Sequence, residues 1–280
     1  MKLKDEDFIK LAGYIKSKYG LNLTTKKFLV ESRLTNYVLD CGFNDFSEYL
    51  QTVYCDKSGS EMANIINRLT TNYTYFMRET EHFKHFTNVF LNEARKNSKD
   101  KDLRIWSAGC SFGNEPYNLA MCMDDYFGSE RYFWDTRILA TDISFNALRS
   151  AKRGIFPEQA LRELPQDWVK KYFLKLGNGT YQVAERIRSN VIFKYHNLME
   201  PITFKKKFDL IVCRNVMIYF DEQTKADLFQ RFYDATAEGG YLYIGHAETC
   251  PKNMKYTLVQ PAVYKKISGK EGFECQTKEF

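Results

Sequence analysis

The sequence lacks the cysteine and histidine patterns that disulfide scaffolds and structural metal sites require. The number of cysteines is odd and no two have C-x-x-C spacing; they stand at positions 41, 55, 110, 122, 213, 250 and 275. Among the four histidines only His82 and His85 are close in sequence, with no third ligand in view. Such a pair is more often a packing or surface feature than a zinc site, so we expect no metal centre and no disulfide framework.

Long apolar runs are also missing. None reaches the roughly 18 residues that a membrane-spanning helix needs, and the first residues, MKLKDEDF, contain no apolar signal-peptide core. The cysteine usage fits a reducing compartment. We therefore expect a cytoplasmic protein that does not insert into a membrane.

Charge of one sign is not strongly in excess. The formal net charge is +6 over 280 residues, which permits a nucleic acid, an acidic protein partner or neither. A solubilising surface is the simpler interpretation, so we expect no nucleic-acid partner. The 44% hydrophobic and 16% aromatic content indicates an ordered chain, long enough for roughly two domains.

What is present first is a series of helical patterns. Apolar residues from Phe8 to Tyr19 recur at helical spacing, and Gly20 is suited to end that helix. A second helix is predicted to begin at Thr24 or Thr25 and to end near Gly42. Its expected face carries Phe28, Leu29, Ser32 and Leu39.

Two further helices are predicted from capping boxes. Asp45 with Glu48, and Ser58 with Glu61, have the spacing in which each side chain satisfies a free backbone N–H group. We therefore expect a helical N-terminal domain at residues 1–86. The charged run at 87–102 lacks periodic apolar residues after Ala94 and predicts a helix tail and a solvated linker, hence a domain boundary.

The stretch LRIWSAGCSFGNEPYNLA, residues 103–120, predicts a strand, a small-residue turn and a helix. This arrangement places backbone N–H groups and a helix N-terminus beside a ligand. The turn has no Lys-Ser or Lys-Thr pair, so nucleoside triphosphate chemistry is not expected. Glu115 at the turn would repel a pyrophosphate but accept a cation or a ribose hydroxyl, which favours a nucleoside-type ligand without phosphates.

Strands and helices then alternate, which predicts a parallel sheet with covering helices in a domain spanning 103–268. Asp142 follows the second strand, where a carboxylate can bind ribose hydroxyls or cap a helix. A small antiparallel insertion is expected at about 172–189, with strands near 172–176, 180–184 and 186–189, because LGNGT contains the Asn-Gly hairpin signal. A hairpin near 256–267 should close the fold, and residues 269–280 are expected to be a frayed tail.

Polar residues at the strand ends should converge on one crevice, as in open α/β sheets. These residues are Glu115, Asp142, Asn197, Leu198, Arg214 and Asn215. The sequence contains no Ser-His-Asp set, no paired catalytic carboxylates and no reactive cysteine environment. A polar crevice without a nucleophile fits a group-transfer enzyme whose cofactor carries the reactive atom. From its pattern alone, the segment 70–83 is expected to be the start of an amphipathic helix.

Five segments resemble the CheR-type chemotaxis receptor methyltransferases. They are TTNYTYFMRE (70–79), WSAGCSFGNEPYNLAM (106–121), ATDIS (140–144), IVCRNVMIYF (211–220) and GGYLYIGHAE (239–248). The resemblance spans nearly the whole chain. It implies an α/β fold, in which a Rossmann-type methyltransferase domain with a small antiparallel β insertion follows an all-α N-terminal domain.

The resemblance also implies an activity. Enzymes of this family transfer the methyl group of S-adenosylmethionine to glutamates on receptor cytoplasmic helices, which gives S-adenosylhomocysteine and a glutamate methyl ester, the chemistry of sensory adaptation. The receptor would be the partner of this chain, which we expect to be a monomer.

The same resemblance assigns roles to residues and reverses the reading of 70–83. Asn72, Thr74 and Arg78 would reach the cofactor from the interdomain segment. Glu115 and Asp142 would contact the amino-acid and ribose portions of the cofactor. The resemblance does not assign which carboxylate holds which portion. Asn197 and Leu198 would flank the adenine, and Arg214 and Asn215 would lie by the methionine end. Arg78 and Tyr219 would sit near the transferred methyl group as the catalytic residues.

Two departures from the family pattern affect receptor docking. Asn36 and Tyr37 stand where some members present arginines to the receptor, which leaves receptor choice open. The LGNGT turn is shorter than the glycine-rich loop of members that dock a receptor C-terminal pentapeptide. We therefore expect a pentapeptide-independent enzyme.

Two other functions compete with this interpretation. One is a methyltransferase acting on nucleic acid or a small molecule, although Arg214-Asn215-Val216-Met217 replaces the Asn/Asp-Pro-Pro-aromatic run of enzymes that methylate base amino groups. The other is a catalytically silent module that binds S-adenosylmethionine. Such a module would be expected to lack Arg78 or Tyr219, and both are present.

Overall fold

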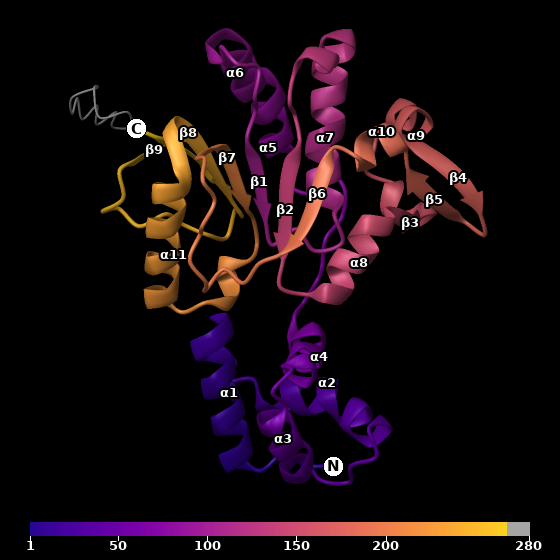
Figure 1. Ribbon diagram of the computed structural model, residues 1–280, viewed down its shortest axis with the longest axis vertical. Helices are drawn as coiled ribbons and strands as arrows, with labels where there is room; N and C mark the ends of the chain where they lie inside the picture. The colour runs from indigo at the N-terminus through magenta and orange to yellow at the C-terminus, as the bar shows by residue number, and fades with distance from the viewer. Residues whose placement is uncertain (268–280) are drawn as a thin grey trace.

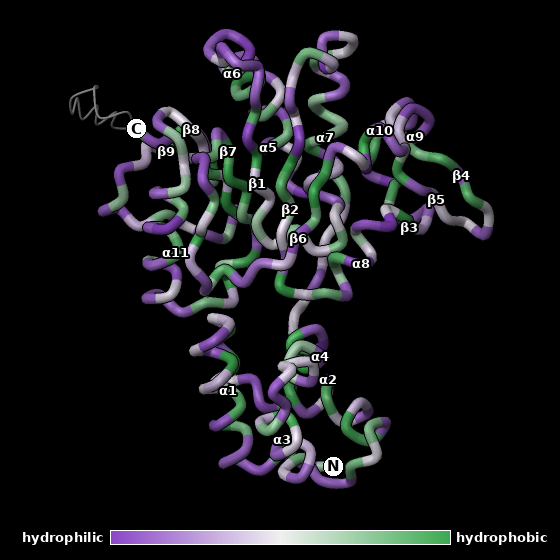
Figure 2. The backbone as a smooth tube through the Cα atoms, in the orientation of Figure 1, coloured by the Kyte–Doolittle hydropathy of each residue, from purple (hydrophilic) through white to green (hydrophobic). Residues whose placement is uncertain are grey.

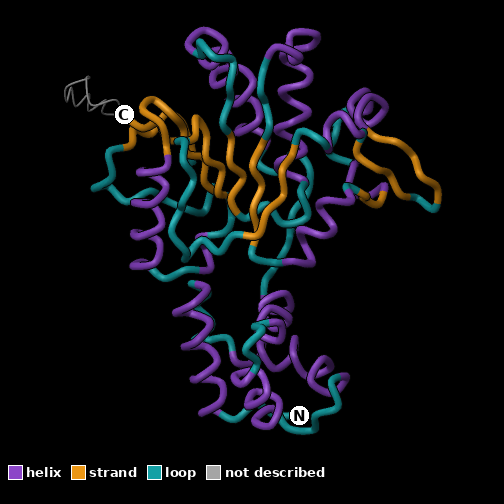
Figure 3. The backbone as a smooth tube through the Cα atoms, viewed as in Figure 1, coloured by secondary structure: helices purple, strands orange, loops and turns teal. Residues whose placement is uncertain are grey.

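The chain forms a small helical domain beneath a larger α/β domain (Figure 1). A computed structural model describes residues 1–267, so the tail expected at 269–280 lies outside the described residues. Among the described residues, strands occur only in the upper domain (Figure 3). Within the described part of the chain, no helix combines the length and the apolar character needed to cross a bilayer.

The helical domain buries its own core. Its helices are α1 (Asp5–Tyr19), α2 (Lys27–Asp40), α3 (Phe46–Cys55) and α4 (Ser60–Leu69). Gly20 ends α1 in the left-handed conformation, as predicted, and Asp45 caps α3 by accepting from the N–H groups of Ser47 and Glu48. The side chains of Ile15, Leu34 and Ile65 are completely buried where the helices meet.

Two details of this domain differ from the prediction. The core face of α2 is Val30, Leu34 and Val38, whereas Phe28 is 82% exposed. The helix carries two apolar stripes, and spacing alone does not tell which one packs inward. The predicted cap Ser58 also does not fill that role, because the Asp56 carboxylate accepts the Glu61 N–H and left-handed Gly59 precedes α4.

The upper domain is a seven-stranded sheet with helices on both faces. Its strands are β1 (Ile105–Ala108), β2 (Ile138–Asp142), β6 (Val191–Tyr195), β7 (Phe208–Cys213), β8 (Thr236–Ile244), β9 (Tyr256–Gln260) and β10 (Val263–Lys266). The spatial order is β6-β2-β1-β7-β8-β10-β9. The first five of these are mutually parallel, and the predicted terminal hairpin adds β10 and β9 antiparallel.

The helices that cover the sheet are α5 (Thr80–His85), the π-helix η1 (Phe86–Phe90), α6 (Leu91–Asn97), α7 (Asn114–Phe127), α8 (Phe145–Arg153) and α11 (Glu222–Ala235). Alternate strand residues face opposite layers. Ile105 joins the cluster beneath α5 to α8, whereas Trp106 joins the cluster beneath α11. Hydrophobic residues accordingly concentrate on the central strands (Figure 2).

The segment 87–102, predicted to be a helix tail and a solvated linker, is helical as far as Asn97. Phe90 and Leu91 are buried against the sheet domain, whereas Arg95 and Lys96, further along α6, are exposed. The chain instead leaves the helical domain after Leu69 and runs without regular structure to Glu79. The amphipathic helix expected at 70–83 therefore begins only at Thr80.

The insertion is a three-stranded sheet that projects to one side (Figure 1). Its strands are β3 (Ile155–Pro157), β4 (Phe173–Gly177) and β5 (Thr180–Val183), in the order β3-β5-β4. The prediction of a strand near 186–189 is wrong, since these residues belong to or follow the short helix α10 (Glu185–Arg188) and β3 supplies the third strand. The remaining short helices are η2 (Gly128–Phe133), η3 (Glu158–Leu161), α9 (Gln166–Tyr172) and η4 (Met217–Tyr219).

Candidate active site

A cavity lies where the carboxyl ends of β1, β2, β6 and β7 face the helical domain. Both domains line it, together with the segment that joins them. All ten residues singled out from the sequence are in its lining: Asn72, Thr74, Arg78, Glu115, Asp142, Asn197, Leu198, Arg214, Asn215 and Tyr219. The strand-end residues meet here because parallel strands end at one edge of the sheet.

The turn after β1 is held by Asp142. One carboxylate oxygen accepts the Ser111 N–H at 2.8 Å and the other accepts the Ser144 N–H at 2.8 Å. Burial nevertheless raises the pKa of this carboxyl above its ordinary value. Gly109 has φ of +82°, and a Cβ there would lie 2.4 Å from Val216 Cγ2. Only glycine therefore allows the turn to approach the loop after β7.

Arg214 is the centre of a buried ionic network. Its Nε lies 3.1 Å from Glu79 Oε2, one terminal nitrogen lies 3.1 Å from Glu115 Oε2, and the other donates to the carbonyl of Arg78. Glu115 also accepts from the Ser107 hydroxyl at 2.7 Å. Burial raises the pKa of Glu115 despite the neighbouring guanidinium. When both carboxyl groups are ionised, the pair carries one more charge than the single arginine.

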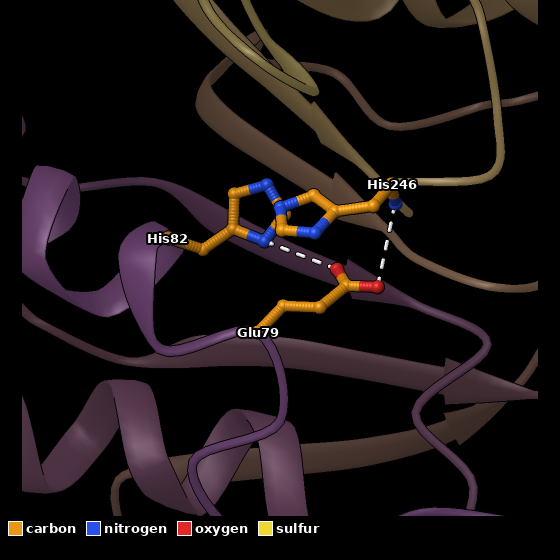
Figure 4. Close-up of side chains that lie close together, drawn as sticks. All are labelled: Glu79, His82 and His246. Carbon is orange, nitrogen blue, oxygen red and sulfur yellow. Dashed lines mark hydrogen bonds and ion pairs between the residues drawn. The ribbon is translucent and has the colours of Figure 1, made fainter.

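Glu79 was missed by the sequence analysis. Its backbone is left-handed, with φ of 55°, and its side chain points toward His82 (Figure 4) and also contacts Arg214. Burial opposes ionisation, but the His82 contact and the Arg214 charge prevail and hold the pKa of Glu79 well below its ordinary value. Asn215 Nδ2 and the His246 N–H approach the other oxygen at 3.3 Å each. Its sequence neighbours gave no sign of these partners, which are more than 130 positions away.

Arg78 occupies the cavity differently from Arg214. It is half-buried and donates to the Tyr73 carbonyl at 2.9 Å, with its guanidinium 5.7 Å from the Tyr73 ring centre and 5.9 Å from that of Tyr75. The segment is anchored by completely buried Phe76, whose ring lies 4.9 Å from that of Phe156. The anchor fixes Arg78 at the cavity.

The amide of Asn197 and the backbone of Tyr219 join the domains. Asn197 Nδ2 donates to the Lys18 carbonyl at 2.7 Å, while its oxygen accepts the Met199 N–H at 3.0 Å. The Tyr219 carbonyl accepts the Asn22 N–H at 2.9 Å. Asn197 therefore positions the helical domain over the cavity as well as lining it.

Glu248 is a second residue that the sequence analysis missed. It is 9% exposed and accepts from the N–H groups of Gly245, Asn215 and Ile218. These bonds tie the loop after β8 to the loop after β7. The buried Oδ1 atom of Asn215 has no hydrogen-bond partner, so the site retains an unused acceptor.

The chemistry available in the cavity is binding and orientation. Burial raises the pKa of Cys110 well above its ordinary value, so this thiol stays protonated and is a poor nucleophile. The lining contributes carboxylates, guanidinium groups, amides and a phenol, without a Ser-His-Asp arrangement among the described residues. Such a site suits a cationic ligand that brings its own reactive group.

Comparison with known proteins gives the family. Residues 6–70 match the family described as "CheR methyltransferase, all-alpha domain", and residues 72–264 match "CheR methyltransferase, SAM binding domain". The chain is 41% identical to a chemotaxis protein methyltransferase of Borreliella burgdorferi, over 94% of each chain. It is 33% identical to that of Escherichia coli, covering 94% of this chain and 91% of the relative. It is 34% identical to chemotaxis protein methyltransferase 1 of Pseudomonas aeruginosa, and the match covers 89% of this chain and 92% of the relative. The cofactor is thus S-adenosylmethionine, and the chain belongs to the CheR methyltransferase family.

Proposed function

We propose that this protein is a protein-glutamate O-methyltransferase, which methylates specific glutamate side chains on the cytoplasmic helices of chemotaxis receptors. The observation that carries the proposal is the cavity between the domains, which combines buried carboxylates with the partly free guanidinium of Arg78. The buried carboxylates suit a cationic cofactor, and the Arg78 guanidinium suits an anionic substrate side chain. The protein would act as a monomer in the cytoplasm.

The residues fit the cofactor. S-adenosylmethionine carries an ammonium and a sulfonium, and the Glu79–Arg214–Glu115 network has one excess negative charge. We assign the amino-acid and ribose portions to Glu115 and Asp142 between them, and the adenine to the neighbourhood of Asn197 and Leu198. Asn72 and Thr74 would close over the cofactor, while Arg214 and Asn215 would hold the methionine end, where the Asn215 Oδ1 acceptor is unused.

Little acid–base chemistry is required of the protein. A bound cofactor supplies an electrophilic methyl group. A substrate glutamate has a pKa of about 4.3 and is already ionised at neutral pH, so no general base is needed. Arg78 would hold the carboxylate by charge-assisted hydrogen bonds, and Tyr219 would line the opposite wall near the reacting atoms. Their contribution is proximity and orientation.

The test uses the full chain, methyl-labelled S-adenosylmethionine and receptor cytoplasmic fragments. The expected result is label on the receptor that mild base releases as methanol, because a glutamate methyl ester is base-labile. Receptor fragments with the methylated glutamates changed to alanine form the matched control and should stay unlabelled. Label on nucleic acid, base-stable label or no transfer would overturn the proposal.

A further inference from the structure

Three potential metal ligands converge beside the cavity (Figure 4). Glu79 precedes α5, His82 lies within that helix, and His246 follows β8. One ligand atom from each lies within 4.8 Å of the others. The sequence showed only the pair His82 and His85; the fold brings in His246 and Glu79, and His85 instead contacts the Tyr243 hydroxyl at 2.6 Å.

His82 is the unusual member of this cluster. It is 1% exposed, yet neither ring nitrogen has a hydrogen-bond partner among residues 1–267. Its Nδ1 lies 3.3 Å from Glu79 Oε2 without the alignment of a hydrogen bond. A buried imidazole is normally satisfied.

The neighbouring rings and charges are compatible with a cation. The His82 ring stacks on Tyr243 at an interplanar angle of 18°, and the His246 ring lies 5.1 Å away on the exposed side. Glu79 and Glu115 together offset Arg214 with one negative charge remaining. A metal ion bound to Glu79 would be attracted by this negative charge. A cationic cofactor in the adjoining cavity would be attracted by the same charge.

We propose that Glu79, His82 and His246 form a binding site for a divalent transition metal ion of the zinc class, and that this ion and the cofactor weaken each other's binding. Two imidazoles and a carboxylate suit Zn²⁺, Co²⁺ or Ni²⁺ rather than Mg²⁺ or Ca²⁺, and three protein ligands leave a fourth position for water. The coupling passes through Arg214, which contacts Glu79 on one side and Glu115 on the other. Such coupling is reciprocal.

Direct metal binding tests the first half of the proposal. The exposed Cys41 and Cys55, together with Cys275, are changed to serine so that these thiols do not take up the ion. Zn²⁺ is titrated by calorimetry and Co²⁺ by visible absorption, both without cofactor. His246→Ala, an exposed position that should leave the fold intact, is expected to weaken binding by about tenfold or more. The control Glu81→Gln, exposed on the same helix, should bind as the parent does.

The coupling is tested with S-adenosylhomocysteine and S-adenosylmethionine as cavity ligands, so no methyl transfer is needed. Saturating Zn²⁺ should weaken S-adenosylmethionine binding to the parent by about threefold or more, a modest coupling energy, and should leave His246→Ala unaffected. It should act less on S-adenosylhomocysteine, which lacks the sulfonium charge. Absent binding, or binding that His246→Ala does not change, would overturn the site. Unaltered S-adenosylmethionine affinity in the presence of bound Zn²⁺ would overturn the antagonism.

Discussion

Two arginines share the cavity but are held in different ways. Arg214 is 8% exposed and engages Glu79, Glu115 and the Arg78 carbonyl. Among the hydrogen bonds of the described residues, the Arg78 guanidinium makes one, to the Tyr73 carbonyl. The Arg78 side chain is part of the cavity lining. Arg214 therefore builds the site, while Arg78 retains the capacity to bind a further carboxylate.

Removing the Arg78 guanidinium should slow methyl transfer. We expect Arg78→Ala to lower turnover on receptor fragments by about 100-fold, the usual effect of losing one positioned charge at a reacting centre. The matched control is Arg149→Ala, an exposed arginine on α8, which should stay within twofold of the parent. Initial rates at saturating cofactor measure both. Equal rates for the two variants would contradict the assigned role.

The Glu79 carboxylate should contribute to stability in a pH-dependent way. Glu79→Gln removes one partner of a buried ion pair and should lower the free energy of unfolding by about 3 kcal/mol at pH 7. Because the folded-state pKa of Glu79 is depressed, this stabilisation is complete above the unfolded value of about 4.3 and is lost as pH falls below it. The difference between parent and variant should therefore shrink between pH 5 and the acid range. Urea unfolding at several pH values measures it.

A neighbouring glutamate provides the control for that experiment. Glu81 is exposed, and within the described part of the chain its carboxylate pairs only with Lys84, at 2.7 Å. Glu81→Gln should change the free energy of unfolding by less than about 0.5 kcal/mol, since exposed pairs contribute little. A Glu79→Gln effect of the same small size, or one that does not vary with pH, would mean that the ionic network is not stabilising.

Among the individual site residues, the sequence predicted those that directly follow a strand. It missed those whose role depends on partners far away in the sequence. Asp142 and Arg214 could be found because each follows an apolar strand. No sequence pattern identified Glu79, Glu248 or His246. Their partners are determined by how α5 and the loop after β8 pack against the loop after β7. The role of Arg78 came from resemblance to a family, not from spacing.

The turn between β1 and α7 should tolerate no side chain at Gly109. Gly109→Ala meets both the left-handed backbone and Val216 Cγ2 at 2.4 Å, so it should lose about 1–3 kcal/mol from crowding in addition to the strain. Gly42 has φ of +86° and open space around its Cβ position, so Gly42→Ala measures strain alone. Adding Val216→Ala to Gly109→Ala should recover part of the loss. Unfolding free energies and S-adenosylhomocysteine affinity give the result, and additive effects of the two substitutions would refute the clash.

The hairpin of the insertion should not hold a receptor tail. Its turn, Gly177–Asn178–Gly179, has positive φ at each residue and connects β4 directly to β5, so no long loop is available beside the strands. We expect a receptor C-terminal pentapeptide to show no saturable binding tighter than about 100 µM in calorimetry. A scrambled peptide is the control. Micromolar binding of the native peptide alone would contradict the prediction.

The existence of a helix or strand was easier to predict from the sequence than its neighbours in the fold or the direction in which its side chains face. The Asn-Gly signal located the hairpin of β4 and β5 correctly, but local pattern could not reveal that β3, some 15 residues before β4, would complete the small sheet. Helix α2 shows the same limit, because choosing between its two apolar stripes requires the positions of α1 and α4. Periodicity reports an amphipathic face only when one face is apolar.

The function of the whole molecule depends on the interface between its two domains. Lys16 pairs with Asp221 at 2.7 Å, Asn67 accepts from the Ser144 hydroxyl at 2.8 Å, and Asn197 bonds to the end of α1. Gly20 lies so close to the upper domain that a Cβ would be 2.6 Å from Met199 Sδ. Apolar contacts add to these bonds, since Ile143 packs against the core of the helical domain and Leu21 packs against the cluster beneath α11. We expect the ligand to order the cavity between the domains further.

Ligand binding should therefore protect both domains from hydrogen exchange. A cofactor at 100 times its dissociation constant stabilises the native state by about 2.7 kcal/mol. Because residues 19–26 and 69–78 line the cavity together with the strand ends, S-adenosylhomocysteine should slow exchange in both of these stretches as well as at 109–115 and 196–198. The β4–β5 turn, which is absent from the cavity lining, is the internal control and should exchange at an unchanged rate. Protection confined to the sheet domain would mean that the helical domain serves the receptor alone and takes no part in closing the cofactor site.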